Sequence, residues 1–434
     1  MGAPEAATAT RVPRGQRRAV AVVVAVVFLD LVGFGVVIPI LPYYVRSFGV
    51  SDVAIGLLAA SYSIMQFLFA PVLGRLSDAR GRRPVLMLSL AGSVIAWTAF
   101  GLAGEASALF GTLAGLATLF AARMVAGAMG GNIATAQAYV ADVTPVERRA
   151  GALGLIGASF SLGFIFGPAL GGLFASDAVV QAAGSVFPAF VPATRFSLPS
   201  FAAAGLSLAA LAGAAIFLRE PERTRGRAQR TSLVGGFASA LRDANLRGLV
   251  VAFFVASVAF SGIQVMFIPF VADVYGYDAT AVSLLLTYVG LLGAANQGVL
   301  VGQLARRFPT ARIAIAGAAV LLVSLAAMPF SPEIGRTLLP AVGPIGPELL
   351  ALLLALGLLA VGNGLLNVSL ATLVSVGASE EEQGSAFGVT QGAGSLGRTV
   401  GPPAMAALYV VARPAPFVAG ALLVVPIIAI LVEI

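Results

Sequence analysis

The sequence predicts an all-α membrane protein in which twelve transmembrane helices form two pseudo-symmetric six-helix bundles. Its 434 residues are 59% hydrophobic and only 10% charged, whereas a soluble domain carries about 25% charged residues. Twelve apolar runs approach or exceed the ~20 residues that a helix needs to cross a bilayer. A glycine–proline pattern at residues 154–172 returns 234 residues later, at 388–406. A pattern that occurs once in each half indicates a duplicated membrane protein.

Each expected span is a run of mostly apolar residues between charged or proline-containing segments. The predicted spans are residues 19–45, 53–74, 84–104, 108–141, 150–175, 199–218, 246–272, 281–304, 311–330, 348–377, 384–410 and 414–432. A long polar stretch separates span six from span seven. The predicted domains are a cytoplasmic N-terminal tail (1–18), an N-terminal six-helix bundle (19–218), a cytoplasmic basic linker (219–245) and a C-terminal six-helix bundle (246–434).

The placement of the arginines predicts the orientation. All 26 basic residues are arginine, and if both termini are cytoplasmic, twenty of them lie on the cytoplasmic side. Four lie outside, at Arg46, Arg195, Arg336 and Arg413. Because cytoplasmic loops carry the excess of basic residues, we expect a multi-pass protein of the cell inner membrane with both termini in the cytoplasm.

The composition limits the chemistry. The chain has no cysteine and no histidine, so disulfides are excluded and the commonest metal ligand and general base are missing. An enzyme is disfavoured, and no metal and no cofactor are expected. The pI near 10.3 comes from arginines at membrane edges, so nucleic acid is not an expected partner. The expected partners are a small-molecule substrate, protons and membrane lipids. Nothing in the sequence calls for an oligomer, so we expect a monomer.

The glycine–proline pattern lies in predicted span five. Its members are Gly154, Gly163, Gly167, Pro168 and Gly172. Glycines let a neighbouring helix approach closely, and proline bends the helix that carries it. We expect this helix to pack against a helix of the other half and to slide as the halves move. The alternative is ordinary packing of small residues.

A second motif lies between predicted spans two and three. Its members are Gly74, Asp78, Gly81, Arg82 and Arg83. Gly74 permits tight packing at the end of span two, and Gly81 permits a sharp turn. Asp78 can lie at the N-terminus of a facing helix and pair with an arginine. We expect a latch that joins the two halves on the inner side in one state. The alternative is a basic loop without a gating role.

Three charged residues lie inside predicted spans, where an unpaired charge costs at least ~3 kcal/mol on insertion scales. Asp30 in span one and Arg123 in span four lie at similar depth in the same half. We expect them to be neighbours that form a proton–substrate exchange site, or else a static buried pair. Arg398 in span eleven has no evident acidic partner, so it attracts an anionic group or binds backbone carbonyls.

Uncharged polar residues inside the spans are candidates for the substrate path, because such side chains either join helices or face a cavity. The predicted substrate-binding residues are Gln66, Asn132, Gln264, Gln297, Asn363 and Arg398. Gln66 and Asn132 are favoured, since both lie in the half that contains Asp30.

Both motifs resemble signatures of a known family. The loop motif resembles that of the major facilitator superfamily, and the glycine–proline motif resembles that of its antiporter branch. Residues 25–175 are similar to bacterial tetracycline efflux proteins, in stretches such as Phe28–Gly35 and Arg123–Gly127. The resemblance implies the major facilitator fold and a twelve-span drug:proton antiporter. It also implies functional roles for Asp30, Gln66, Asp78, Arg82 and Arg123.

The chain departs from those efflux proteins at three places. Ala96 stands where they carry an aspartate, residues 293–295 lack their histidine, and residues 311–330 contain no acid. Their metal–tetracycline chemistry therefore cannot be transferred. We expect a secondary active transporter that expels a small organic compound or drug in exchange for protons. The alternatives are a facilitator or proton symporter that imports a sugar, an organic anion or a metabolite, and a receptor that binds without transport.

Overall fold

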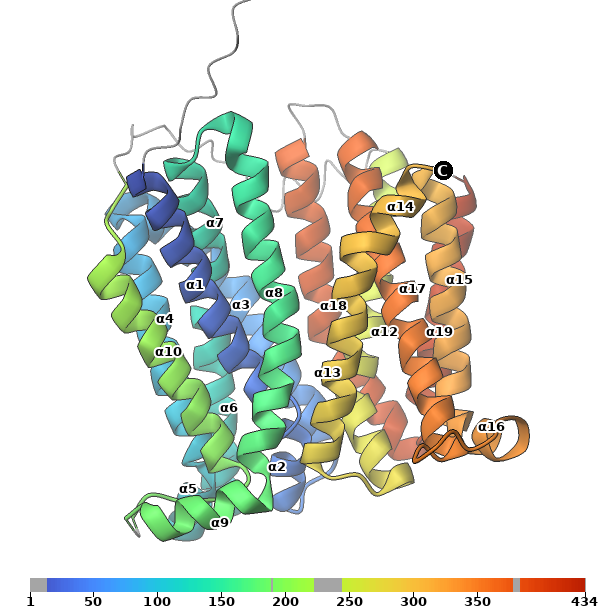
Figure 1. Ribbon diagram of the computed structural model, residues 1–434, viewed down its shortest axis with the longest axis horizontal. Coiled ribbons are helices and arrows are strands. Elements are labelled where there is room, and N and C mark those ends of the chain that lie inside the picture. The colour runs from blue at the N-terminus through green and yellow to red at the C-terminus, as the bar shows by residue number, and fades with distance from the viewer. Residues whose placement is uncertain (1–13, 189, 222–243, 378–382, 434) are drawn as a thin grey trace, which may run out of the picture.

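The computed structural model describes residues 14–188, 190–221, 244–377 and 383–433. This part of the chain is helical and contains no β-strand, only one isolated bridge between Val342 and Ile345. Figure 1 shows two groups of long, roughly parallel helices side by side, one from each half of the chain. Most of the predicted linker lies outside the described residues, so the domain boundaries stay predictions.

The helices of the first group precede residue 218. They are α1 (Arg14–Val37), α2 (Leu41–Ser47), α3 (Val53–Arg80), α4 (Arg82–Gly101), α5 (Ala103–Phe110), α6 (Thr112–Met129), α7 (Asn132–Val143), α8 (Val146–Ala175), α9 (Asp177–Val186) and α10 (Ser197–Phe217). The helices of the second group follow residue 243. They are α12 (Ala244–Tyr275), α13 (Ala279–Ala295), the π-helix η1 (Asn296–Leu300), α14 (Val301–Ala305), α15 (Thr310–Ala327), the 3₁₀ turn η2 (Met328–Phe330), α16 (Ser331–Leu338), α17 (Pro347–Gly377), α18 (Gln383–Val411) and α19 (Ala415–Glu433).

Ten helical segments of the described chain are long and apolar enough to cross a membrane. They coincide with ten of the predicted spans. The other two predicted spans are helical as well: α13 continues through η1 into α14, and α18 covers residues 383–411. The prediction of an all-helical membrane protein is confirmed, while the number of twelve spans and the cytoplasmic termini stay predictions.

Three helix boundaries differ from the prediction. Span one was expected to reach residue 45, but α1 ends at Val37 and α2 begins after Pro39, which cannot donate a backbone hydrogen bond. Span two was expected to end at Gly74, but α3 continues to Arg80. The second motif is therefore mostly helix, with a single turn at Gly81. Predicted span four is broken into α6 and α7.

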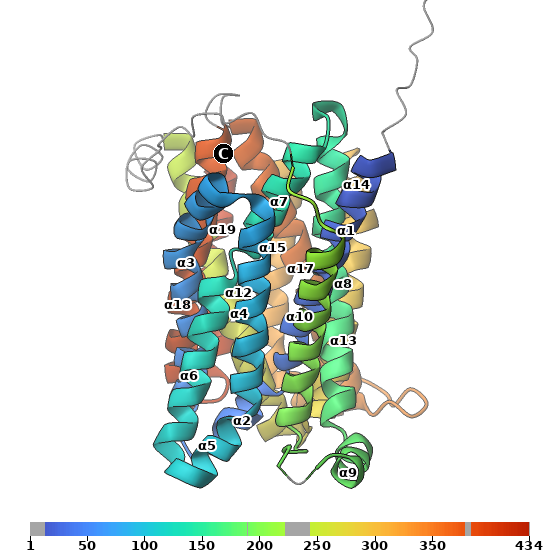
Figure 2. The same cartoon turned by 90° about the vertical axis from the view of Figure 1, so that its left-hand side faces the viewer.

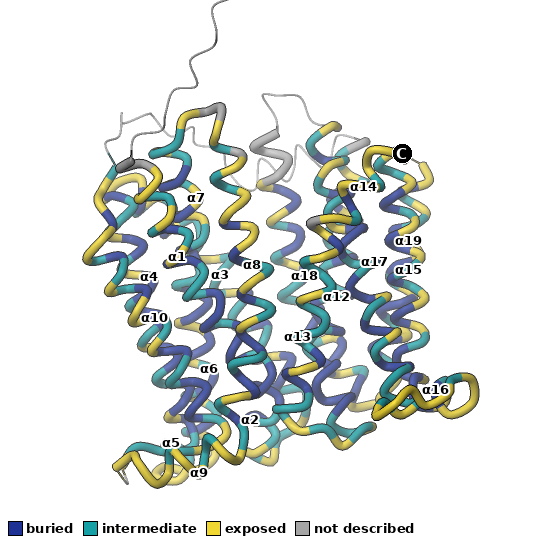
Figure 3. Tube along the Cα trace, viewed as in Figure 1, coloured by how far each residue is buried: buried dark blue, intermediate teal, exposed yellow. Residues whose placement is uncertain are grey.

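The start of α1 and the end of α19 lie at the same end of the molecule, which we call the inner end after the predicted orientation (Figure 1). The short helices α2, α5, α9 and α16 lie at the opposite, outer end, as the rotated view in Figure 2 also shows for α2, α5 and α9. No residue of α9 is buried, and Figure 3 shows this helix as an exposed rim. Large apolar side chains on other outward faces are exposed too, for example Leu113 at 81%. Such surface is suited to lipid rather than water.

The two halves repeat the same helix contacts. Helix α8 packs against α1, and α18 packs against α12. A side chain at Gly167 would come within 2.5 Å of the Gly35 backbone, and one at Gly401 within 2.4 Å of the Val258 carbonyl oxygen. Both glycines therefore permit the same close approach. Helices α8 and α18 continue through Pro168 and Pro402 without interruption.

The glycine–proline motif was expected to pack against a helix of the other half. The structure shows that the middle of the motif instead packs within its own half. Gly163 and Gly167 contact α1 of their own half, and only Gly172 meets the other half, where a side chain would lie 2.6 Å from Ser283 of α13. The contact of α8 with α13 is repeated by that of α18 with α3. There, a side chain on Gly56 would lie 2.5 Å from the Pro402 carbonyl oxygen.

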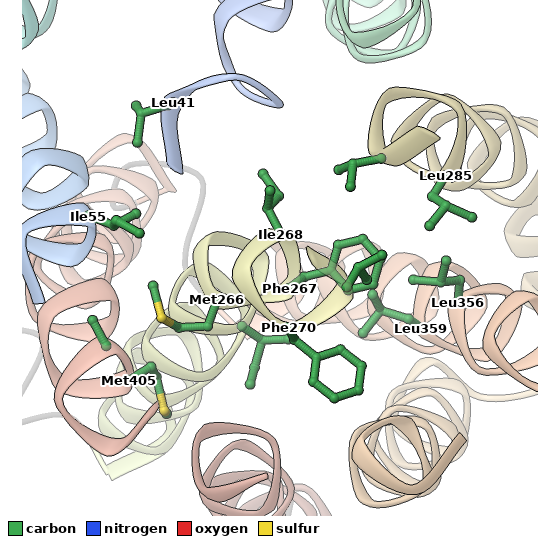
Figure 4. Packing of buried hydrophobic residues seen from close by; sticks show 14 of the residues in the cluster. Leu41, Ile55, Met266, Phe267, Ile268, Phe270, Leu285, Leu356, Leu359 and Met405 are labelled. Atoms are coloured by element: carbon green, nitrogen blue, oxygen red, sulfur yellow. The ribbon is translucent and has the colours of Figure 1, made fainter. Parts of the chain in front are cut away.

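The halves are packed together at the outer end. One buried apolar cluster contains Leu41 and Ile55 of the first half together with Met266, Leu285 and Met405 of the second. Figure 4 shows these side chains around α12, with Ile55 on the side of Met266 and Met405. This shared apolar core closes the outer end between the halves.

The inner end is different. No neighbouring helix comes within 4 Å of the space that a side chain on Gly74, Gly154 or Gly388 would occupy. All three glycines were expected from the motifs to lie in close helix packing. They lie near the inner ends of α3, α8 and α18. The three other buried apolar clusters of the described residues each belong to a single half, so the shared apolar core is the one that includes the outer end.

Candidate functional site

Asp30 lies on α1, ~24 Å along the helix from its start and ~10 Å from its end, and therefore within the predicted membrane span. The Asn132 amide nitrogen, at the first position of α7, donates a hydrogen bond to the Asp30 carboxylate at 2.5 Å. The hydroxyl groups of Ser93 in α4 and Ser207 in α10 also face this carboxyl group. Asp30 therefore lies inside the first bundle, among four of its helices.

Asn132 is only 3% exposed, and its amide oxygen has no hydrogen-bond partner among the described residues. The amide thus has one occupied donor and one unused acceptor directly beside a carboxyl group. An asparagine side chain can donate to an ionised carboxylate or accept from a protonated one. The pair can serve both protonation states of Asp30.

Arg123 of α6 is 7% exposed and lies on aromatic rings. Its guanidinium carbon is 4.6 Å from the centre of the Tyr62 ring and 5.8 Å from that of Phe34. This is the geometry of a cation–π interaction. The Nε atom of Arg123 has no hydrogen-bond partner, and no carboxylate of the described chain lies within 4.0 Å of the guanidinium.

The structure does not join Asp30 and Arg123 by an ion pair, although the sequence predicted them to be neighbours. Phe34, one turn after Asp30 on α1, occupies the place beside Arg123 that Asp30 was expected to take. Tyr62 of α3, whose ring lies under the Arg123 guanidinium, is within electrostatic range of both charges.

The break between α6 and α7 lies between Arg123 and Asn132. At this break a side chain on Gly130 would come within 3.0 Å of the Gln66 amide nitrogen and of the Tyr62 hydroxyl. The glycine lets α3 approach the broken helix. Discontinuous helices within the membrane are typical of substrate sites in transporters.

Arg398 of α18 is a half-buried cation of the second half. Its guanidinium donates to the Ser395 hydroxyl at 2.9 Å and lies within electrostatic range of Tyr62. As with Arg123, no carboxylate in the described ranges lies within 4.0 Å of it. Tyr62 is thus shared by two arginines, one from each half of the chain.

Two predicted substrate residues, Gln66 and Asn132, lie in this group. Three others lie elsewhere: Gln264 is half-buried in α12, Gln297 is exposed in η1, and the Asn363 side-chain oxygen accepts a hydrogen bond from Asn367 at 2.7 Å. In the described chain none of these three is hydrogen-bonded to Asp30, Asn132 or either arginine. A role for them stays a prediction.

The neighbour of Gln297 is more firmly held than Gln297 itself. Asn296 is 4% exposed, and its amide nitrogen donates to the backbone carbonyls of Ala360 and Val361 at 3.2 and 3.1 Å. Asn296 therefore fixes the π-helical turn of span eight against α17. Such turns are frequent at functional sites.

Among the described residues, the second motif makes its side-chain contacts within its own half. Arg82 pairs with Asp78 at 2.6 Å and with Asp142 of α7 at 2.9 Å. The Glu220 carboxylate accepts from the backbone N–H of Arg82 and Arg83 at 2.7 and 2.9 Å, at the N-terminus of α4. An anion at this position is stabilised by the helix dipole and the unpaired N–H groups.

One predicted role of this motif is corrected, because the anion at the N-terminus of α4 is Glu220 rather than Asp78. Asp78 joins no helix of the other half within the described residues, and the latch, which was expected in one state only, stays a prediction. Gly81 has φ +117°, and a side chain there would meet the Glu220 carboxylate at 2.8 Å, so the expected sharp turn does require glycine. The Arg83 guanidinium donates to the Ala215 carbonyl.

An ion-pair network joins the halves at the outer end, and the sequence analysis missed it. Arg46 of α2 binds Asp52 of its own half at 2.7 Å and Asp273 of α12 at 2.8 Å. The Tyr409 hydroxyl of α18 donates to Asp273 at 2.8 Å. In the sequence, Arg46 serves only to assign the orientation, and no sequence pattern identifies Asp52 or Asp273 as its partners.

A tyrosine contact accompanies this network. The Tyr43 hydroxyl donates to the backbone carbonyl of Tyr277 at 2.6 Å, across a separation of 234 residues. This contact joins the two halves at the outer end, beside the Arg46–Asp273 pair.

These features define a membrane transporter of two related halves, closed outside, with buried charges at the level where a helix is broken. The Major Facilitator Superfamily profile matches residues 23–402, and the chain belongs to this family of transporters. The chain is 34% identical over 307 residues to the class C tetracycline resistance protein of Escherichia coli, which covers 69% of this chain and 71% of that protein. It is 30% identical to the class D protein of Salmonella ordonez over 89% of both chains.

The fold is also similar to that of solved transporters. The crystal structure of the human organic anion transporter MFSD10 matches with a TM-score of 0.63 and 22% identity, covering 96% of this chain and 100% of that one. The resemblance to tetracycline efflux proteins that the sequence indicated is thereby confirmed, and the likeness to the human structure shows the fold.

Proposed function

We propose that the protein is a secondary active transporter of the cell inner membrane that expels a small organic compound in exchange for protons by alternating access. The observation that carries this proposal is the Asp30 carboxylate, which Asn132 binds beside the broken helix of span four. A carboxyl group inside a membrane protein is a functional group by default, because burial of a charge without a function is selected against by its free-energy cost.

The proposed proton step takes place at this pair. When Asp30 is ionised, its carboxylate accepts the bond from the Asn132 amide nitrogen. When Asp30 is protonated, its carboxyl O–H donates a hydrogen bond to the Asn132 amide oxygen after the amide rotates. Asn132 begins α7, so this change moves the helix break beside Gln66 and Tyr62. Proton binding thereby alters the substrate site without direct contact between Asp30 and the substrate.

The closed outer end supports the alternating-access part of the proposal. Arg46–Asp273 and Tyr43–Tyr277 hold the halves together outside, and the glycines near the inner ends of α3, α8 and α18 are free of neighbouring helices. A compound would enter from the inner side in this state. In the opposite state the inner ends would close, and Asp78 and Gly74 would then come within reach of the second half.

The proton gradient supplies enough free energy for this transport. One proton that enters across 100 mV releases ~2.3 kcal/mol, which concentrates a neutral substrate about fifty-fold. The relatives are named for tetracycline resistance, which supports efflux of a drug-like compound. Because residues 311–330 contain no acid, we do not extend the proposal to tetracycline. In this proposal the protein works as a monomer in lipid, without a cofactor, a metal or a catalytic residue.

A second candidate is a facilitator or proton symporter that imports a sugar, an organic anion or a metabolite. Arg123 and Arg398 have no carboxylate partner among the described residues, which favours an anion as the substrate of this candidate. The fold neighbour that is named as an organic anion transporter agrees with it. Proton binding at Asp30 would then accompany substrate binding rather than oppose it.

Solid-supported-membrane electrophysiology on the purified protein tests the proposal. Drug-like compounds are screened for currents that depend on an imposed proton gradient. We expect such currents from the wild type and their loss in Asp30→Asn. This change keeps the shape of the side chain but removes the carboxyl group that binds and releases a proton. Asp177→Asn, at the exposed outer rim, is the matched control and should leave the current unchanged.

Two results would contradict the proposal. A full proton-dependent current in Asp30→Asn would show that another group carries the proton. Substrate flux of equal rate with and without a proton gradient would favour the facilitator, and flux of protons in the same direction as the substrate would favour the symporter.

A further inference from the structure

Arg123 and Arg398 raise a question that the proton step leaves open, because each is a cation within a predicted span, and no carboxylate of the described residues lies within 4.0 Å of it. Arg123 is 7% exposed, its Nε atom has no hydrogen-bond partner, and its neighbours are the Tyr62 and Phe34 rings. Among the described residues Arg398 is hydrogen-bonded only to the Ser395 hydroxyl, and its helix α18 packs against α3, which carries Tyr62. Charges removed from water are paired in native proteins, so two cations without a carboxylate partner on either side of α3 indicate a missing negative group.

We propose that Arg123 and Arg398, together with Tyr62, bind a negatively charged group of the transported compound, which is therefore an organic anion. This inference rests on the proposed function, since it names the substrate class of the same site. A guanidinium group presents several N–H donors in a plane that matches a carboxylate, sulfonate or phosphate. The anion supplies the charge that the described protein does not.

The surroundings indicate that the anion has an aromatic or apolar body. Phe34 and Tyr62 are in ring contact at 5.3 Å, and Trp97 lies 6.4 Å from Phe34. The Phe34 and Tyr62 rings border Arg123, so a compound bound to its guanidinium lies against an aromatic surface. Aromatic groups stack favourably on both rings and guanidinium planes.

The two arginines come from different halves, which gives the anion a mechanical role. Arg123 belongs to α6 of the first half, and Arg398 belongs to α18 of the second. An anion that binds both guanidinium groups draws the halves together around itself. Binding of the substrate then favours closure at the inner end, as alternating access requires.

The charge of the substrate also changes the driving force. Exit of a monovalent anion against entry of one proton moves two charges through the membrane in each cycle. A potential of 100 mV, negative inside, favours each charge movement by about fifty-fold. The potential alone therefore favours anion exit, even without a pH gradient.

Equilibrium binding to the purified, full-length protein tests the inference with three probes of the same shape. They are the anion 2-naphthoate, the neutral 2-naphthamide and the cation 2-naphthylmethylammonium, measured by isothermal titration calorimetry. We expect the anion to bind at least about ten-fold more tightly than the amide, and the cation to bind weakest, because two guanidinium groups attract the anion and repel the cation.

Four variants test the residues. Arg123→Gln and Arg398→Gln should each lower the affinity for 2-naphthoate roughly 10- to 100-fold, as expected when a charged hydrogen bond is lost, and leave the affinity for the amide within about two-fold. Arg398→Lys keeps the charge and should recover most of the anion affinity. Arg195→Gln, an exposed outer arginine, is the control that should bind as the wild type does.

The thermal stability of the unliganded variants separates a binding role from a structural one. A cation that lacks an anion destabilises the empty protein, so Arg123→Gln should unfold at the same temperature as the wild type or higher. A lower unfolding temperature, together with equal loss of affinity for all three probes, would overturn the inference. Tightest binding of the cation, or no binding of the anion, would overturn it as well.

The outcomes for the two proposals are distinct. Proton-linked currents that Asp30→Asn abolishes, with a cation or a neutral compound as substrate and no anion binding, would leave the proposed function standing and remove this inference. Arginine-dependent anion binding without any proton-linked current would support the anion site and contradict the exchange mechanism.

Discussion

At the scale of single residues, the charges that matter most are those whose partners the sequence does not show. Asp30, Arg123 and Arg398 could be selected from the sequence because each interrupts an apolar run. Their partners could not be, since side-chain direction decides whether Asp30 reaches Arg123 or Asn132. Phe34 and Tyr62 became neighbours of Arg123 through the packing of α1 and α3, which no local pattern encodes.

The outer ion pair gives a prediction at this scale. Hydrogen bonding to Asp52, followed by that to Asp273, raises the pKa of Arg46 above its ordinary value despite partial burial. The stabilisation from a raised arginine pKa is lost only when the pH rises through that pKa. Arg46 therefore stays charged throughout the physiological range, and the outer closure does not open by its titration.

Asp273→Asn removes the charge that binds Arg46 across the halves, so it should open the outer end more often. We expect a single cysteine at Ser283→Cys, which is 1% exposed beside Gly172, to react about 2- to 10-fold faster with an impermeant maleimide added from outside. The factor corresponds to ~0.5–1.5 kcal/mol for a partly exposed pair. The chain has no native cysteine, so the label reports this position alone.

The control for that experiment removes an ion pair within one half. Asp177→Asn breaks the exposed pair of Asp177 with Arg195 at the outer rim. This change should leave the labelling rate of the Ser283→Cys protein unchanged. Equal acceleration by both variants would mean that the Arg46–Asp273 pair has no special part in closure.

At the scale of helices, the sequence predicted which helices exist and in what order. It did not predict where a helix is interrupted or extended. Composition and hydropathy located the apolar runs, because a membrane helix must satisfy its own backbone and be apolar over ~20 residues. The break of span four was missed, although the pair Gly130–Gly131 between Arg123 and Asn132 could have indicated it. The extension of α3 to Arg80 was missed because a polar helix beyond the membrane carries no apolar signal.

The glycine–proline helices give a prediction at this scale. Gly167→Ala should destabilise the protein by roughly 1–3 kcal/mol, because an added methyl group would meet the Gly35 backbone, which cannot yield. Gly401→Ala should have a similar effect through the Val258 carbonyl oxygen. Gly157→Ala, on the same helix as Gly167 but with no neighbour within 4 Å, is the matched control. Thermal unfolding in detergent measures all three.

The comparison of the two sensitive glycines tests the repeat itself. If the halves are related by internal symmetry, the unfolding temperatures of Gly167→Ala and Gly401→Ala should fall by comparable amounts. A fall for one variant and none for the other would show that the two helix pairs are packed differently, against the repeated contacts of α1 with α8 and α12 with α18.

At the scale of the whole molecule, the protein is two related bundles that meet at the outer end. The Tyr43 hydroxyl and the Tyr277 carbonyl are hydrogen-bonded where the bundles meet. The apolar cluster that contains Ile55, Met266 and Met405 extends this contact. The sequence predicted the two halves from their repeat. It could not predict which end is closed, because both states use the same sequence and differ only in the tilt of rigid halves.

The central claim is that the two halves tilt relative to each other, so that one end opens as the other closes. Spin labels at two pairs of exposed positions test it by double electron–electron resonance in lipid. Ser185 and Thr337 report the outer end, and Gly151 and Gln303 report the inner end. On a change of pH or addition of the transported compound, we predict that the inner distance shortens while the outer distance lengthens. Distances that stay constant, or that change together in the same direction, would contradict the account.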